Sequence, residues 1–311
     1  MANIAKKPSN VYLSVMKTRA RSIARWCVAS LCVVCLAVFV HDAWGRWADV
    51  EAALTGALTS PGLMAAELAL MVANLGVETL RWRSVRGIFT GGSAADDAAA
   101  SLRAISLGNA TPGNVGEHVG RCAAYADKGR AAVASVAASA LQTAVIALLG
   151  MAACAFLSSG GAAVPPLAMR VGAAAFAVMC AIAIVAAAAL RKRVRPRAGW
   201  GARLAAATLL NALKVGIFSL QLLLLLRAGS NADCGILFAA VVYYYYLVTL
   251  TPRVNIIDIG VKGSLASYVL ASGMCAEATV TSAVVVIWAV NILLPSAIGF
   301  VTMPLKRGVS R

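Results

Sequence analysis

Six long apolar runs constrain this chain more than any other feature of its sequence. They occupy residues 26–44, 63–80, 131–157, 167–190, 204–226 and 278–302. A helix needs about 20 consecutive apolar residues to cross a bilayer, so each run is a candidate span. The chain is 61% hydrophobic and 13% charged, whereas soluble domains have about 45–50% apolar and about 25% charged residues. We therefore predict an all-α polytopic membrane protein with a single transmembrane domain over residues 1–311.

Two further segments, residues 98–127 and 234–272, are moderately apolar but interrupted by Pro, Gly, Asn and charged residues. Each has a Thr-Pro pair near its middle, and proline breaks a helix by removing a donor and clashing with the preceding turn. Broken helices at membrane depth occur where protein or a wet cavity surrounds them. We predict two re-entrant helical hairpins, with a pair of full crossings as the alternative for each. The expected breaks lie at Pro112, Gly113, Gly116 and Pro252.

The basic residues predict the orientation of the spans. Lys and Arg gather in the N-terminal tail, in residues 81–103 and 191–203, and at the C-terminal end, and short loops rich in Lys and Arg lie in the cytoplasm. The loops at 41–62 and 158–166 are acidic or uncharged and are expected outside. Both termini are therefore predicted to be cytoplasmic, and the first run is interpreted as a retained helix rather than a signal peptide. The net charge of +16 then records orientation, not nucleic-acid binding.

The order of these elements predicts an inverted repeat. Residues 1–157 and 167–311 each contain a span, a second span, a broken hairpin and a last span, which gives six spans plus two hairpins, or eight helical units. The first half starts in the cytoplasm and the second starts outside, so the hairpins open to opposite faces. Inverted repeats with broken helices are a recurrent transporter architecture, with the binding site near the midplane.

Each predicted hairpin carries an acid and a base four residues apart. The pairs are Glu117 with Arg121 and Asp258 with Lys262, and residues at that spacing share one face of a helix. Pairing offsets part of the cost of about 2.5–3.5 kcal/mol for a charge at the bilayer centre. One interpretation is that these pairs only lock the hairpins. The other is that Arg121, Lys262 and Arg253 offer positive charge to a lipid headgroup, where an arginine can bind phosphate in a bidentate manner.

Two apolar runs carry polar stripes. Glu67, Met71, Asn74 and Glu78 share one helix face, and Glu78 is also within reach of Arg81. The matching helix of the second half has its own stripe, formed by Asn211, Lys214, Phe218 and Gln221. Because polar residues in spans usually face the bundle interior, we predict that the two stripes form a polar cleft. Interhelical hydrogen bonding for stability alone is the alternative.

The four consecutive tyrosines at 243–246 sweep a full helical turn, so they cannot all face one cavity. We expect most of them to pack within the bundle or to anchor it at the membrane interface.

The sequence shows no sign of resident catalytic chemistry. It contains no Walker A motif, nucleophile elbow, HExxH motif or recognisable triad, and its two histidines make a histidine metal site improbable. The cysteines lie mostly in apolar runs, where small packing residues are expected. We therefore expect no cofactor, no metal and no enzyme activity.

Several of these segments resemble the transmembrane region of the lysylphosphatidylglycerol synthase family, also called flippase-like membrane proteins. The resemblance covers nearly the whole chain and is carried by residues 74–82, 111–121, 203–221 and 251–263, the second with the pattern T-P-x-x-x-G-E-x-x-x-R. Lys214 and Lys262 stand where the family pattern has arginine. The resemblance implies a bacterial inner-membrane protein that moves a lipid to the outer leaflet. We expect no synthase activity, because the synthase domain is not part of this sequence.

We therefore expect a translocase that binds or moves the headgroup of a phospholipid or a lipid-linked glycan without ATP hydrolysis. The expected headgroup-binding residues are Glu78, Arg81, Glu117, Arg121, Lys214, Arg253, Asp258 and Lys262. The expected partners are membrane lipids, with an envelope glycosyltransferase or lipid synthase as a further candidate and no nucleic acid. Two alternatives stay open: an accessory subunit or enzyme of envelope glycolipid assembly, and a membrane scaffold whose ion pairs are structural.

Overall fold

The fold is described from a computed structural model of residues 30, 33–160, 165–191, 197–251 and 258–302, without the side chains at 112, 182–191 and 258. Within these ranges every regular element is a helix, which confirms the predicted all-α class. After an apolar helix at Val33–Gly45, the helices are α2 (Trp47–Thr59), α3 (Pro61–Phe89), α4 (Ala94–Ala110), α5 (Val115–Cys122), α6 (Lys128–Ser159), α7 (Pro166–Arg191), α8 (Trp200–Leu226), α9 (Cys234–Leu250), α10 (Asp258–Leu270), α11 (Glu277–Trp288) and α12 (Leu294–Thr302).

Among the described residues, four helical stretches are long and apolar enough to cross a membrane. They are Pro61–Phe89, Lys128–Ser159, Trp200–Gly229 and Glu277–Thr302, and they coincide with four of the six apolar runs. Large apolar side chains on their outer faces are exposed, as expected for lipid contact; Val72, Leu148 and Leu209 expose 62%, 59% and 72% of their surface. These features indicate a multi-pass membrane protein. Of the two remaining runs, the first contains the helix at Val33–Gly45 and the second, residues 167–190, coincides with nearly all of α7.

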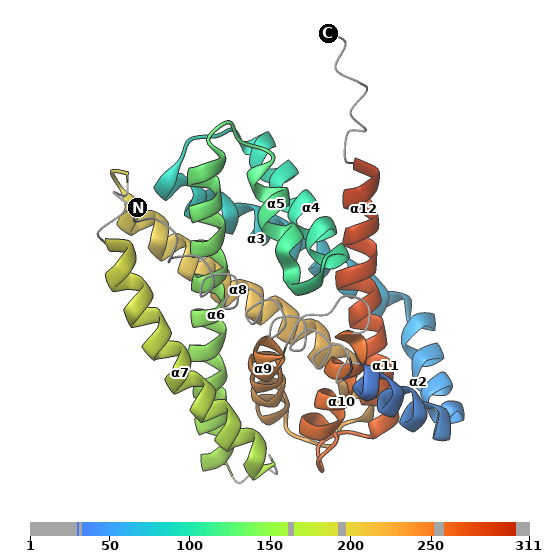
Figure 1. Cartoon of the computed structure of the whole chain (residues 1–311). Coiled ribbons are helices and arrows are strands. Elements are labelled where there is room, and N and C mark those ends of the chain that lie inside the picture. The colour runs from blue at the N-terminus through green and yellow to red at the C-terminus, as the bar shows by residue number, and fades with distance from the viewer. Residues whose placement is uncertain (1–29, 31–32, 161–164, 192–196, 252–257, 303–311) are drawn as a thin grey trace, which may run out of the picture.

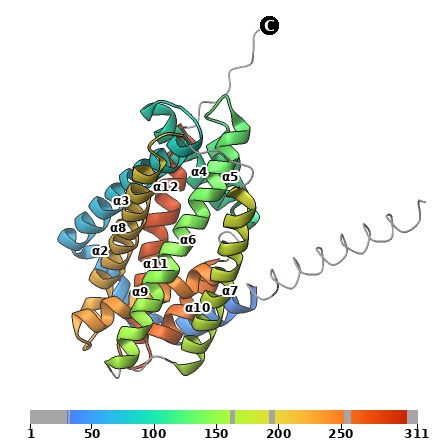
Figure 2. The same cartoon turned by 90° about the vertical axis from the view of Figure 1, so that its left-hand side faces the viewer.

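Helices α3 and α8 form the centre of the bundle and lie side by side (Figure 1). Helix α6 packs against both of them, and α9 packs against α6 and α8. Helices α4 and α5 fold back on each other near one end of the bundle, whereas α10 lies near the other end, as both views show (Figures 1 and 2). Each helix pair, α4–α5 and α9–α10, therefore approaches the central α3–α8 pair from a different end.

The helix interruption predicted at Thr111-Pro112 is present between α4 and α5. A single 3-10 turn, Pro112–Asn114, joins the two helices, and Gly113 and Asn114 adopt left-handed backbone angles with φ of 66° and 61°. Glycine adopts this conformation at little cost, which explains Gly113. Gly116 lies where α5 passes directly over α4, and a Cβ there would collide with the Leu107 carbonyl. The two glycines thus permit the turn and the close approach that follows it.

The second interruption lies between α9 and α10. Helix α9 ends at Leu250, and α10 begins at Asp258 and packs back against α9. Pro252 and Arg253 fall in the intervening segment, outside the described residues.

The tyrosines before this break pack within the bundle, as expected. The Tyr243 hydroxyl donates to the Ala168 carbonyl at 2.7 Å, and the Tyr246 hydroxyl donates to the Gly172 carbonyl at 2.5 Å. Both acceptors belong to α7, and both rings are fully buried. The tyrosines therefore anchor α7 to the rest of the bundle.

The prediction that residues 41–62 form a loop is wrong. Helix α2 occupies 13 residues of this segment and packs against α11, with Val50 buried in the contact. The tertiary contact stabilises a helix too short to be stable alone. Pro61 then starts α3 at the first helical position, where its missing amide hydrogen is not needed.

A buried polar network ties α3 to α4 and to the connection before α6. Arg86 forms a bidentate pair with Asp97, at 2.6 and 2.9 Å. The Tyr125 hydroxyl donates to Asp97 at 2.7 Å and accepts from the Trp82 indole nitrogen at 2.8 Å. Burial is the main cause that raises the pKa of Tyr125, and the hydrogen bond to Asp97 raises it further. The hydroxyl therefore stays protonated and acts as a hydrogen-bond donor.

We expect Asp97→Asn to destabilise the protein by about 3–5 kcal/mol, as is typical when one partner of a buried ion pair is removed. The amide would leave the Arg86 guanidinium buried without a counter-charge. Thermal unfolding in detergent measures the loss. Asp127→Asn is the matched control, because Asp127 pairs with Arg130 at an exposed site and asparagine retains its helix cap. Equal losses in both variants would contradict the assigned role of the network.

The last described helix contains one π-helical turn. This turn, η4 (Ala289–Leu293), joins α11 to α12 without a break in direction. Pro295 follows two residues later, and because it has no amide hydrogen it cannot donate to the carbonyl four residues earlier, at Asn291. Single π turns are rare and frequently mark functional sites.

Candidate functional site

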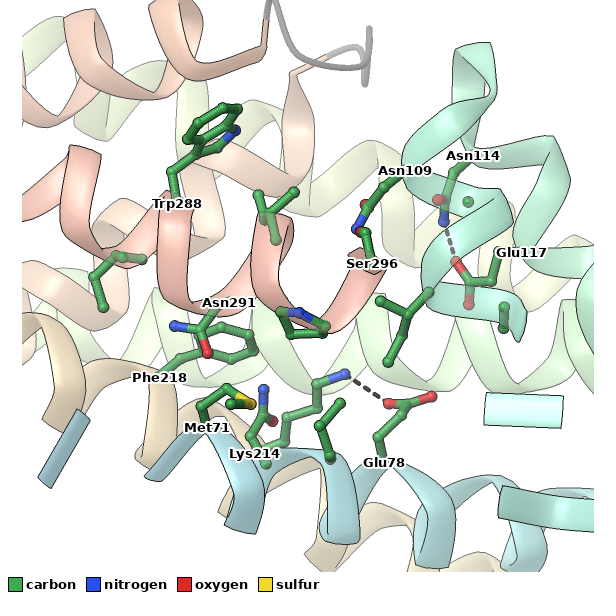
Figure 3. Close-up of a pocket in the computed structure, with 18 of the residues that line it drawn as sticks. Met71, Glu78, Asn109, Asn114, Glu117, Lys214, Phe218, Trp288, Asn291 and Ser296 are labelled. Carbon is green, nitrogen blue, oxygen red and sulfur yellow. Dashed lines mark hydrogen bonds and ion pairs between the residues drawn. The ribbon is translucent and has the colours of Figure 1, made fainter. Parts of the chain in front are cut away.

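A cavity of about 500 Å³ lies between the α4–α5 pair, the central α3–α8 pair, the α9–α10 pair and the η4 turn (Figure 3). Its walls combine aliphatic side chains with a group of charged residues and several carboxamides. Buried clefts of this size, mostly apolar with a few convergent polar groups, are typical ligand sites. The cavity is therefore the candidate functional site.

Glu78 on α3 is the centre of the charged wall. Its carboxylate lies 2.6 Å from Arg81, 2.8 Å from Arg121 and 2.6 Å from Lys214, so one acid pairs with three bases. These bases come from α3, α5 and α8. Glu78 is 4% exposed, and a buried carboxylate is stable only when it is paired in this way.

Arg121 joins the α4–α5 pair to this cluster. One of its terminal nitrogens contacts both Glu78, at 2.8 Å, and Glu117, at 2.7 Å, and its guanidinium lies 4.9 Å from the centre of the Trp82 ring. The Nε and Nη1 donors are buried and have no hydrogen-bond partner among the described residues. Unpaired buried guanidinium donors are costly, and an anion that accepted hydrogen bonds from them would offset that cost.

The turn between α4 and α5 holds Glu117 in place. The Asn114 side-chain amide donates to Glu117 (Figure 3), and Thr111 Oγ1 accepts from the Gly116 amide at 2.6 Å. The residues of the T-P-x-x-x-G-E-x-x-x-R pattern thus form one local unit. The turn positions the acid, and the acid in turn positions Arg121.

The opposite wall is formed by carboxamides, hydroxyls and aromatic rings. Asn109 donates to Ser296 Oγ at 2.8 Å and links α4 to α12. Trp288, Asn291 and Phe218 also line the cavity (Figure 3). All of these groups are neutral, and the carboxamides and the serine hydroxyl can both donate and accept hydrogen bonds. The cavity therefore has a charged wall and a neutral polar wall.

The structure brings together six of the eight residues expected at the site. Glu78, Arg81, Glu117, Arg121, Lys214 and Lys262 all line the cavity. The Glu117–Arg121 and Glu78–Arg81 pairs form as the sequence spacing predicts. Arg253 and the side chain of Asp258 lie outside the described part of the chain, so the second predicted pair is not described.

The two predicted polar stripes face each other across the α3–α8 contact. Lys214 pairs with Glu78, and the Gln221 amide donates to the Glu67 carbonyl at 3.1 Å. Asn74 and Asn211 line the cavity beside them. The predicted polar cleft is therefore present where the charged ends of the stripes meet.

Sequence reasoning missed two parts of the site. It paired Arg121 with Glu117 alone, because the contact with Glu78 joins residues 43 positions apart and no spacing rule reports it. It also missed the neutral wall formed by Asn109, Asn291 and Ser296. The Pro295 ring inside an apolar run was the available signal, since a proline there disturbs the helix.

No protein-family model matches the chain, and a search of curated proteins gives no significant match. The resemblance to flippase-like membrane proteins therefore stays an expectation from the sequence motifs alone.

Proposed function

We propose that the protein is a lipid translocase that binds the headgroup of a phospholipid or lipid-linked glycan and moves it between leaflets without ATP hydrolysis. The observation that carries this proposal is the cluster of Glu78, Glu117, Arg81, Arg121 and Lys214 on the wall of a cavity inside a helical membrane protein. Ionisable groups in spans are rare and usually mark a substrate pathway.

The charges of the cluster favour an anionic headgroup. The three bases and two acids of the cluster leave one net positive charge on this wall of the cavity. Two donors of Arg121, Nε and Nη1, have no partner among the described residues, and each could donate one hydrogen bond to an oxygen of an anion. The aliphatic parts of the lining would accommodate the first carbons of the lipid chains.

The proposal includes the finer architecture: six spans, two re-entrant hairpins and an inverted repeat, in a bacterial inner membrane with cytoplasmic termini. Reciprocal packing supports the repeat. Helix α4 of the first half packs against α12 of the second, while α9 of the second half packs against α6 of the first. Likewise α3 and α8, which hold matching places in the two halves, pack against each other. Movement of the hairpins against these helices would expose the cavity to each leaflet in turn.

The test is lipid movement in vesicles of phosphatidylethanolamine and phosphatidylglycerol with a fluorescent phosphatidylglycerol probe. We expect the purified protein to move the probe between leaflets and Arg121→Ala to reduce the rate at least tenfold. Arg130→Ala, which removes an exposed arginine away from the cavity, is the matched control. An unchanged rate in Arg121→Ala with a folded protein would overturn the role assigned to the cluster.

One observation favours a scaffold instead. Every charged member of the cluster has a partner within the cluster, as in a purely structural lock. A scaffold predicts that replacing Glu117 and Arg121 together with Gln and Met leaves biological function intact. The translocase predicts that the double variant folds but no longer moves lipid.

A further inference from the structure

Helix α3 carries a second buried carboxyl, Glu67, that the cluster does not use. It is fully buried, and neither carboxylate oxygen has a hydrogen-bond partner among the described residues. It does not line the cavity, which begins one turn further along α3 at Met71. Eleven residues separate Glu67 from Glu78, which is about 16 Å along the helix.

The surroundings of Glu67 are neutral. The Gln221 amide on α8 donates to the Glu67 backbone carbonyl at 3.1 Å, and Gln221 in turn accepts from Asn291 on η4 at 3.1 Å. The Tyr245 phenol on α9 lies in the neighbourhood of Glu67, and its hydroxyl donates to the Phe218 carbonyl at 3.1 Å. No cation contacts the carboxyl in the described part of the chain.

The charged groups on the helices that pack against α3 lie elsewhere. Lys214 of α8 is paired with Glu78, and Arg227 beyond the end of α8 is exposed and donates to the Ala232 carbonyl. Asp49 and Glu51 of α2 are exposed. The remaining charges on these helices are Asp96, Asp97 and Arg103 of α4, Lys128 and Arg130 on the first turn of α6, and Arg203 near the start of α8.

An ionised carboxylate in this place would be very costly, because burial of an unpaired charge is avoided by neutralisation. We propose that Glu67 is a proton-binding site, and that its protonation and deprotonation couple lipid movement to a proton gradient. In this conformation the carboxyl group of Glu67 is protonated and neutral. Exposure of α3 to water on one side of the membrane would release that proton, so each cycle transfers one proton with the lipid.

A chain of polar contacts connects Glu67 to the cavity. Gln221 contacts the Glu67 backbone, and Asn291 contacts Gln221 and lines the cavity on the π turn. A change in hydration at Glu67 would therefore act on the turn that bears Asn291, next to Trp288 and the link to α4. The proposed coupling rests on the proposed lipid movement, whereas the proton site itself does not.

The proton site is tested without lipid transport by infrared spectroscopy of the full-length protein in vesicles at neutral pH. We expect a carbonyl band from a protonated carboxylic acid that disappears in Glu67→Gln. Glutamine is isosteric with the neutral acid, so the variant should fold. Glu51→Gln on the exposed face of α2 is the matched control and should keep the band. A wild-type spectrum without the band, or a band that persists in Glu67→Gln, would overturn the proposal.

The coupling is tested with the fluorescent phosphatidylglycerol probe in vesicles that hold a pH gradient of about one unit. With one proton per lipid, the gradient supports up to about tenfold asymmetry between leaflets. We expect asymmetry in the wild type, and unbiased movement without asymmetry in Glu67→Gln. Asymmetry in Glu67→Gln equal to wild type would overturn the coupling. A protein with the infrared band but no lipid movement would refute the proposed function and the coupling, while leaving the proton site supported.

Discussion

Glu78→Gln is expected to destabilise the protein more than any other single substitution in the charged cluster. It leaves Arg81, Arg121 and Lys214 together in a buried site with one acid among them, where loss of one partner from a buried pair alone costs about 3–5 kcal/mol. Repulsion between the three cations adds to that cost. We expect a large fall in the thermal unfolding midpoint in detergent and loss of the monodisperse peak in gel filtration.

The mechanism behind this result can be separated from a general loss of packing. The double variant Glu78→Gln with Lys214→Gln restores the net charge of the cluster, and we expect it to recover part of the lost stability. Glu277→Gln, which removes an acid from an exposed pair with Arg46, is the matched control and should have little effect. If the double variant is less stable than Glu78→Gln, charge balance does not explain the cluster.

Gly116→Ala is expected to have a large effect on function and a smaller effect on stability. The added Cβ would collide with the Leu107 carbonyl, so α5 would have to move away from α4. Overpacking of this kind costs about 1–3 kcal/mol. Because Arg121 sits on α5, the same shift would separate it from Glu78. We expect a modest loss of stability and at least a tenfold loss of lipid movement in the vesicle assay.

Gly76→Ala supplies the comparison, because Gly76 lies within α3 and a Cβ there meets nothing within 4 Å. Alanine is favoured over glycine in a helix by about 0.5–1 kcal/mol. We therefore expect Gly76→Ala to be neutral or stabilising and to leave lipid movement unchanged. Similar losses of lipid movement in both variants would show that the α4–α5 contact has no special role.

The sequence predicts the helical class, the four apolar helices that can span a membrane and the break at Thr111-Pro112, because each depends on local composition or on the fixed geometry of proline. It also predicts the Glu117–Arg121 and Glu78–Arg81 pairs, since the spacing of residues on one helix determines which side chains meet. The alignment of the two polar stripes could also be predicted, because buried polar side chains need hydrogen-bond or ion-pair partners and another polar face supplies them.

Contacts between helices were beyond this reasoning. The pairing of Arg121 with Glu78, and of Arg86 with Asp97, depends on how helices distant in sequence pack together. Helix α2 was missed because its stability comes from packing against α11 rather than from its own sequence. The neutral wall was missed because its members have no regular spacing in an α-helix.

That irregular spacing follows from the π turn at Ala289–Leu293. In a continuous α-helix, Asn291 and Ser296 would point about 140° apart, yet both line the cavity. The additional residue in the turn brings them onto one wall and sets the face that α12 presents to Ser106 and Asn109. Deletion of one residue from this turn would rotate all that follows by about 100°. The number of residues in this turn therefore determines which side chains of α12 face the cavity. A deletion there would disrupt the site more than most substitutions.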